Sequence, residues 1–152
     1  MKHSGIFYRP GSLKARLCVR GNELLGQFTE EHEVAGKDVG KLTVAATLED
    51  LPKLAELEER ARNNKVPGAK RLTREEVKEY EPNVNAVAVL YTPSTGIVSA
   101  AEYVNKLESL VNSTGGMILK RAVVTGIKAQ GDKFVLSVNQ EGEKYQLASG
   151  MI

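Results

Sequence analysis

Hydrophobic residues recur every three or four positions in four stretches of the chain, a spacing typical of amphipathic helices. The first stretch covers residues 12–32, and its apolar positions are Leu13, Leu17, Leu24, Leu25 and Phe28. We expect this stripe to face a hydrophobic core. Cys18 lies on the apolar side of the same stretch and is expected to be a small core residue.

The three later stretches each begin with a hydroxyl residue that is followed three positions later by an acid. In a capping box the hydroxyl accepts a hydrogen bond from the third helical amide, and the acid accepts one from the amide of the hydroxyl residue. The expected ends are residues 63–64, the residue before Pro82, and residues 115–116. The three pairs are Thr47 with Asp50, Thr73 with Glu76, and Ser99 with Glu102.

Short apolar runs between and after these helices indicate strands at residues 41–46, 86–91, 117–119, 122–129, 133–139 and 144–148. The last three are joined by short polar connections suited to hairpins. Phe134, Leu136 and Val138 alternate with polar neighbours, as in a half-buried antiparallel strand. The pattern predicts an α+β fold with a mixed or antiparallel sheet and flanking helices, ending in a β-meander. We expect residues 1–152 to form a single compact fragment.

Composition narrows the possible partners and compartments. The 152 residues carry a formal net charge of +2 without a block of like charges, so neither a nucleic-acid partner nor a membrane surface is indicated. No apolar run approaches the length of a transmembrane helix, and none is predicted. One cysteine and an N-terminus without a signal-peptide pattern favour a cytoplasmic location.

Residues 36–41 have the outline of a phosphate-binding P-loop, but the motif is one residue short and leads into a predicted strand. We therefore predict a turn there. His3, His32 and Cys18 form no cluster with the spacing of metal ligands, so no metal site is predicted.

Several segments resemble, in order, landmarks of the D-amino acid oxidase-like FAD-dependent oxidoreductases. They include HSGIFYRPGSLKARLCVRGNELL (3–25), GKLTVA (40–45) and YTPSTGIV (91–98). Shorter matches are DLPKL (50–54), VPG (66–68), TREEV (73–77) and EP (81–82). The resemblance covers essentially the whole chain, and the PSTGIV run favours the L-2-hydroxyglutarate dehydrogenase branch.

The resemblance implies a division of the chain. Residues from 1 to about 98 would belong to a substrate domain, and residues from about 99 to 152 would supply a helix and the β-meander of an FAD-binding domain. Family members begin with a G-x-G-x-x-G turn that binds the FAD pyrophosphate, and this sequence contains none. We therefore expect an internal fragment whose partner is the missing nucleotide-binding portion of the same protein. Apolar surface left exposed in this way would favour self-association.

The resemblance also suggests site residues. His3 would be the general base that takes the hydroxyl proton of a 2-hydroxy acid; the alternative is a surface histidine at a frayed terminus. The backbone of Val124 would lie along the adenine of FAD; the alternative is a buried strand valine. Close approach to the nucleotide is implied for Ala148, Ser149 and Gly150.

A dicarboxylate substrate requires cations and hydrogen-bond donors. The candidates are Tyr8, Arg9, Ser12, Lys14 and Arg71. A solvated, charged helix face explains Lys14 equally well.

The implied reaction is oxidation of a 2-hydroxy acid, similar to L-2-hydroxyglutarate, to the 2-oxo acid with FAD as the cofactor. The isolated chain is predicted to be inactive because it lacks the pyrophosphate-binding turn. The alternatives are glycerol-3-phosphate oxidation and a binding or assembly module without catalysis.

Overall fold

The computed structural model describes residues 1–150, which form two compact units. The first unit is Met1–Lys106, and the second begins at Leu107. Helix α4 (Ala100–Ser113) contributes residues to both. The assignment of the two parts of the chain to a substrate domain and an FAD-binding domain stays a prediction.

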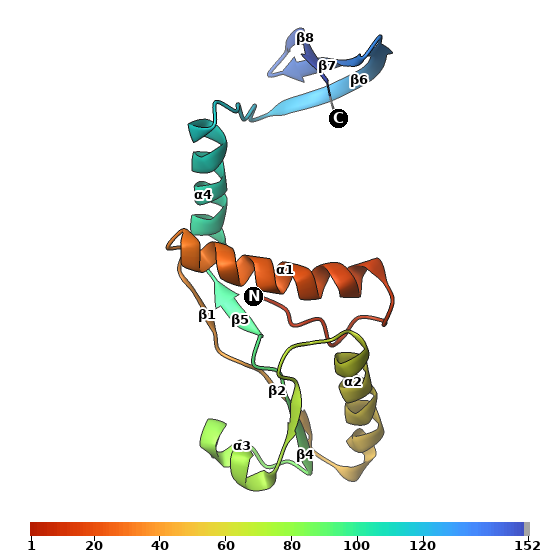
Figure 1. The fold of residues 1–152 in the computed structure, drawn as a ribbon, viewed down its shortest axis with the longest axis vertical. Helices are drawn as coiled ribbons and strands as arrows, with labels where there is room; N and C mark the ends of the chain where they lie inside the picture. Colours follow the sequence, from red (N-terminus) through yellow and green to blue (C-terminus); the bar gives the residue numbers. More distant parts are fainter. Residues whose placement is uncertain (151–152) are drawn as a thin grey trace. The chain divides into compact units, whose positions relative to one another are not determined.

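The centre of the first unit is a three-stranded antiparallel sheet in the order β2-β4-β3. Its strands are β2 (Leu42–Ala45), β3 (Lys70–Leu72) and β4 (Ala88–Tyr91). Helix α2 (Leu51–Asn63) lies on one side of the sheet and α3 (Arg74–Tyr80) on the other (Figure 1). Because strand side chains alternate between faces, Leu90 packs into the cluster with α2, whereas Val89 packs into the cluster with Val77 of α3.

A second group of elements completes this unit. It consists of α1 (Leu13–Glu31) and the antiparallel pair β1 (Gly36–Asp38) and β5 (Gly96–Val98). The backbone of Lys2 forms a bridge to Gly96. The start of the chain therefore adds a third extended segment beside β5.

Helix α1 has the predicted extent, but the face that packs inward is different from the predicted one. Leu13, Leu17 and Leu24 are 61%, 58% and 45% exposed, while the buried residues are Ala15 and Asn22. The N-terminal segment lies very close to the inward face, which carries Ala15, Val19 and Asn22. A Cβ added to Gly5 would stand 2.8 Å from a methyl of Val19. The expectation that the stripe faces the core is wrong for these three leucines, whereas Leu25 and Phe28 of the same stripe are half-buried.

Two of the three predicted capping boxes form. The Asp50 carboxylate accepts from the Thr47 amide at 2.9 Å, ahead of a short 3₁₀ turn, η1 (Leu48–Asp50), that leads into α2. Glu76 accepts from the Thr73 amide at 2.8 Å, and the Thr73 hydroxyl accepts from the Glu76 amide at 3.2 Å. The hydrogen bonds from these threonine amides hold the pKa values of both carboxyl groups below their ordinary values.

Only one of the two hydrogen bonds of the third predicted capping box forms, so the prediction is wrong for Glu102. The Ser99 hydroxyl accepts from the Glu102 amide at 3.4 Å, but the Glu102 carboxylate accepts from the Ala35 amide at 2.8 Å. The Ser99 amide donates instead to the carbonyl of Ala35. Both groups are therefore used to join the beginning of α4 to the residue before β1.

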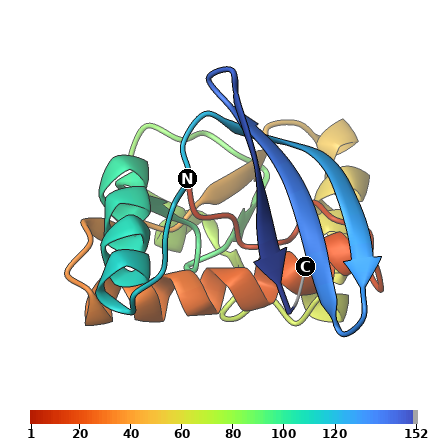
Figure 2. The same ribbon diagram turned by 90° about the horizontal axis from the view of Figure 1, so that it is seen from above.

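The second unit contains the predicted meander, with β6 (Ala122–Gln130), β7 (Lys133–Gln140) and β8 (Glu143–Ser149) side by side (Figure 2). All its pairings are antiparallel, and β6 has an irregularity between Val124 and Gly126. The predicted strand at residues 117–119 does not form. Three-residue strands β1, β3 and β5 were not predicted, and β1 occupies the first half of the turn expected at residues 36–41. The α+β class ending in a meander is confirmed.

None of the helices within residues 1–150 combines the length and the apolar character needed to cross a bilayer.

Candidate functional site

The segment from His3 to Tyr8 is held against the first unit by two asparagine side chains. The Asn22 amide group, on α1, donates to the carbonyl of His3 at 2.9 Å and to that of Ser94 at 2.8 Å. The Asn64 amide group, at the C-cap of α2, donates to the carbonyls of Gly5 at 3.0 Å and Tyr8 at 2.9 Å. Each side chain therefore places both of its donors on backbone carbonyl groups.

Further contacts hold the same segment. An Arg60 nitrogen donates to the carbonyl of Phe7 at 3.1 Å, and the side chain of Ile6 is fully buried. Lys2 is only 8% exposed, and its ammonium lies 2.7 Å from the Asp38 carboxylate. The backbone around His3 is thus tied at several points, so the frayed-terminus alternative is wrong for the backbone. The His3 side chain itself is exposed.

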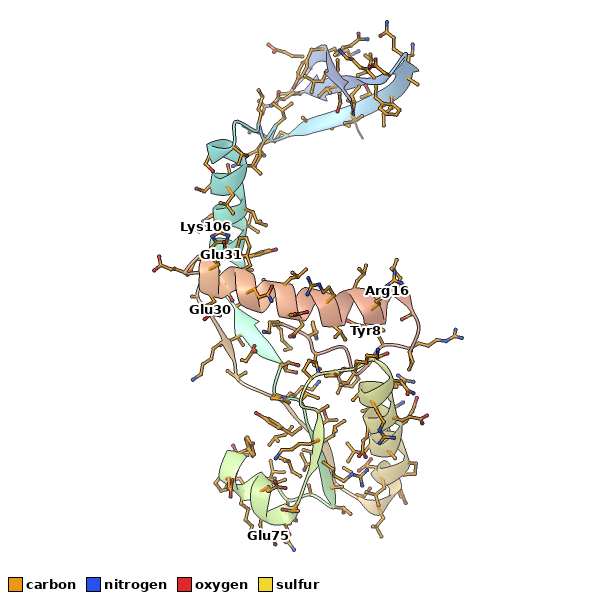
Figure 3. All side chains as sticks on the ribbon, in the orientation of Figure 1. Tyr8, Arg16, Glu30, Glu31, Glu75 and Lys106 are labelled. Carbon is orange, nitrogen blue, oxygen red and sulfur yellow. The ribbon has the colours of Figure 1, made fainter. Side chains whose placement is uncertain are left out.

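His3 and Tyr8 line one small hollow of about 10 Å³, which is roughly the space of one water molecule. Figure 3 shows Tyr8 between α2 and the N-terminal end of α1. Sequence reasoning identified these two residues but missed the rest of the lining. The other lining residues are Ser4, Gly5, Phe7, Lys41 and Thr95.

Lys41 is the cation of this hollow. Its backbone exchanges two hydrogen bonds with Thr92, at 3.1 and 3.0 Å, and its ammonium lies 4.0 Å from the centroid of the Phe7 ring. Burial lowers the pKa of the Lys41 amine. The sequence feature that could have identified Lys41 is the GKLTVA segment. That segment contributed to the family resemblance, but none of its residues was assigned a role.

The other substrate residues expected from the sequence have different surroundings. The Ser12 hydroxyl accepts from the Ala15 amide at 3.1 Å and donates to the Arg9 carbonyl at 2.7 Å, so it serves as the N-cap of α1. The Lys14 ammonium lies 4.7 Å from the centroid of the Tyr8 ring. Arg9 is exposed and does not line the hollow.

Arg71, also expected as a substrate cation, is paired with the Glu58 carboxylate at 2.6 Å. These positions stay predictions as substrate residues, although Ser12 and Arg71 are already engaged within the chain.

Cys18 is half-buried and not part of the core, and its thiol lies 3.5 Å from the carbonyl of His3. Partial burial raises the pKa of the thiol, and the nearby charge of Lys14 opposes that rise. The expectation of a core cysteine is therefore wrong, and Cys18 is another neighbour of the His3 backbone.

The cofactor residues expected from the sequence lie in the meander. Val124 is 50% exposed on β6, so the alternative of a buried strand valine is wrong. It stands opposite Val138 of β7, whereas Ala148 of β8 stands opposite Val135. Because β6 and β8 lie on opposite sides of β7, the sheet does not bring Val124 and Ala148 into contact. Ser149 ends β8, and Gly150 is exposed.

Comparison with known proteins agrees with the resemblance seen in the sequence. Residues 1–150 match the family model described as DAO, FAD dependent oxidoreductase. The human protein named L-2-hydroxyglutarate dehydrogenase, mitochondrial, is 36% identical over 126 residues, which are 83% of this chain and 27% of that protein. L-2-hydroxyglutarate dehydrogenase of Escherichia coli K12 is 32% identical over 143 residues, 93% of this chain and 33% of that protein. The chain spans about a third of the length of the curated relatives it matches.

Solved structures show the same fold. Glycine oxidase from Geobacillus kaustophilus superposes with a TM-score of 0.71 at 21% identity, over 93% of this chain and 40% of that chain. L-proline dehydrogenase from P. horikoshii gives a TM-score of 0.66 at 20% identity, over 89% of this chain and 39% of that chain. Because the family model matches residues 1–150, nearly the whole of this chain, the chain belongs to the DAO family of FAD-dependent oxidoreductases.

Proposed function

We propose that this chain is the substrate-side domain, together with the adjoining β-meander, of an FAD-dependent oxidoreductase that oxidises a 2-hydroxy acid, such as L-2-hydroxyglutarate, to the 2-oxo acid. The observation that carries the proposal is the position of His3, an exposed residue whose backbone is held by Asn22 and which lines one hollow together with Tyr8. The names of relatives at 32–36% identity support the choice of substrate class. The proposed partner is the remainder of the same protein, and a cytoplasmic location stays a prediction.

His3 is the proposed general base. Removing a hydride from the carbon that carries a hydroxyl group produces a carbonyl only if the hydroxyl proton also leaves, and a neutral imidazole can accept that proton near pH 7. FAD, when bound, supplies the hydride acceptor. Tyr8, which lines the same hollow, is proposed to orient the substrate through its phenol. Since the hollow holds about one water molecule, the substrate would lie across its mouth.

The described residues fit FAD in part. Strand β6 pairs only with β7, so its outer edge offers unpaired backbone groups beside Val124, and such groups can hydrogen-bond a base edge. The sequence has no G-x-G-x-x-G turn to hold the pyrophosphate. Val124, Ala148, Ser149 and Gly150 are therefore proposed to contact the nucleotide, and the pyrophosphate would be held elsewhere.

Cofactor binding is tested by titrating the 152-residue chain with FAD and, separately, with FMN while following flavin absorbance and fluorescence. Adenosine has no flavin signal, so its binding is measured by its displacement of bound FAD. We expect FAD and adenosine to bind and FMN not to bind, because the proposed contacts are to the adenine half. The same sample with L-2-hydroxyglutarate should show no turnover. Turnover by the chain alone would contradict the predicted inactivity, and equal binding of FMN would contradict the adenine site.

The catalytic role is tested in a chimera in which this chain replaces the matching segment of the E. coli relative. We expect His3→Gln to lower kcat for L-2-hydroxyglutarate by about 10²–10⁴-fold, the usual contribution of a general base. His32→Gln is the matched control, because the ring of His32 packs on Phe28 away from the hollow. Equal effects of the two substitutions would reject His3 as the base. Preferential flavin reduction by glycerol 3-phosphate would favour that substrate instead.

A further inference from the structure

We propose that Lys41 recognises the carboxylate group of the acid substrate at the hollow that it shares with His3. The proposal rests on the proposed function for the class of substrate. It assigns anion recognition to a residue from the turn before β2, about forty positions away from His3 in the sequence.

The position of Lys41 is well determined by its surroundings. Gly40, immediately before it, has a φ of +73°, and an added Cβ would stand 2.5 Å from the Tyr91 ring, so the backbone turns here where only glycine fits. The two backbone hydrogen bonds to Thr92 then hold Lys41 itself. The Phe7 ring lies against its ammonium. The cation is therefore directed by both backbone and ring contacts.

Lys41 also lacks the counter-ion that other cations of the unit have, whether buried as Lys2 or exposed as Arg71. Lys2 is paired with Asp38 and Arg71 with Glu58, but within residues 1–150 no carboxylate lies in ion-pairing distance of the Lys41 ammonium. The amine is partly desolvated, and this lowers its pKa. A half-buried ammonium without an anion is stabilised when one arrives, because the anion replaces the lost hydration.

The pairing of Lys41 with His3 matches the chemistry of a 2-hydroxy acid. In such an acid the hydroxyl and carboxylate groups are carried by adjacent carbon atoms, so the base and the cation that recognise them must be neighbours. The hollow brings these two residues together, since His3 and Lys41 are both among the residues that line it. Lys14, in contrast, lies on the exposed surface of α1, over the ring of Tyr8.

The experiment is an NMR titration of the full chain with L-lactate and, separately, with propane-1,2-diol, which keeps the hydroxyl but has no carboxylate. We expect L-lactate to shift the Lys41 side-chain Cε–H signals and the His3 ring signals with one saturation curve, whereas the diol shifts neither. Lys41→Gln should weaken L-lactate binding about tenfold or more, the loss expected for one charge-assisted hydrogen bond. Lys37→Gln, an exposed lysine outside the hollow, should leave the affinity within about twofold.

The signals of the unsubstituted chain decide the question even if Lys41→Gln fails to fold, and Lys41→Arg keeps the charge as a second check. The proposal is overturned if the Lys41 signals stay still in L-lactate, or if Lys41→Gln binds as tightly as the unsubstituted chain. L-lactate binding that depends on Lys41, in a chain whose chimera does not oxidise 2-hydroxy acids, would support the anion site while rejecting the proposed function. If the chimera still oxidises 2-hydroxy acids with an unchanged KM after Lys41→Gln, the proposed function would be supported and the anion site at Lys41 would be rejected.

Discussion

Replacing Ile6 with alanine should lower the free energy of unfolding of this chain by about 2–5 kcal/mol. Ile6 is fully buried and belongs to the cluster that joins α2 to the central sheet, with Leu54 and Leu90 among its members. The loss combines the transfer free energy of three buried carbon atoms with the cost of a cavity that the packed strands cannot collapse to fill. Because Ile6 lies between His3 and Tyr8, the same cavity should loosen the candidate site.

Urea unfolding followed by far-ultraviolet circular dichroism measures the effect. Ile97→Ala is the matched control, since it makes the same change on β5 at a side chain that is 58% exposed. The control should cost no more than about 1 kcal/mol, the range of strand propensity. Similar losses for the two variants would mean that Ile6 does not anchor the segment.

Replacing Asn22 with alanine should cost about 1–3 kcal/mol, because two backbone carbonyl groups lose their donor together. Asn22 is 9% exposed, and its bonds join α1 to His3 and to Ser94, which lie at opposite ends of the first unit's sequence. Alanine has a higher helix propensity than asparagine, so the measured loss of stability should be smaller than the contribution of the two hydrogen bonds. The expected further result is faster amide hydrogen exchange in residues 3–6 and broader His3 ring signals.

Asn105→Ala, at an exposed position inside α4, is the control for Asn22→Ala. It has the same gain in helix propensity without breaking a hydrogen bond, so it should be neutral or slightly stabilising. If Asn22→Ala were equally neutral and left hydrogen exchange in residues 3–6 unchanged, the two carbonyl contacts would not hold the site. Asn64→Ala offers an independent check, because its amide donates to Gly5 and Tyr8 in the same segment.

Local signals were sufficient for the elements whose ends depend on neighbouring residues. The η1 turn that leads into α2 and helix α3 both begin at threonine–acid pairs, because capping involves residues only three positions apart. The two helices end next to an asparagine or shortly before a proline, as predicted. The meander was predicted for the same reason, since short turns join adjacent strands. Strands β1, β3 and β5 were missed because each has three residues, which is too few for an alternating pattern.

The candidate site was likewise predicted only in part. Resemblance pointed to His3 and Tyr8 within one continuous segment, and the structure places both at one hollow. Lys41 and Thr95 join them only through tertiary contacts, because the loop around Thr92 exchanges hydrogen bonds with Lys41. Their spacing along the sequence has no period that sequence reasoning could have used.

The sequence by itself determined the helix and strand class, the meander and the family, because these depend on local spacing and on the order of short motifs. Only the tertiary structure decided which face of α1 packs inward. Hydrophobic periodicity favoured the leucines, yet Ala15 and Asn22 are buried, because the N-terminal segment lies against their face of the helix and its His3 carbonyl accepts a hydrogen bond from Asn22. Burial of a polar residue depends on a partner that is distant in the sequence, and no local pattern records that partner.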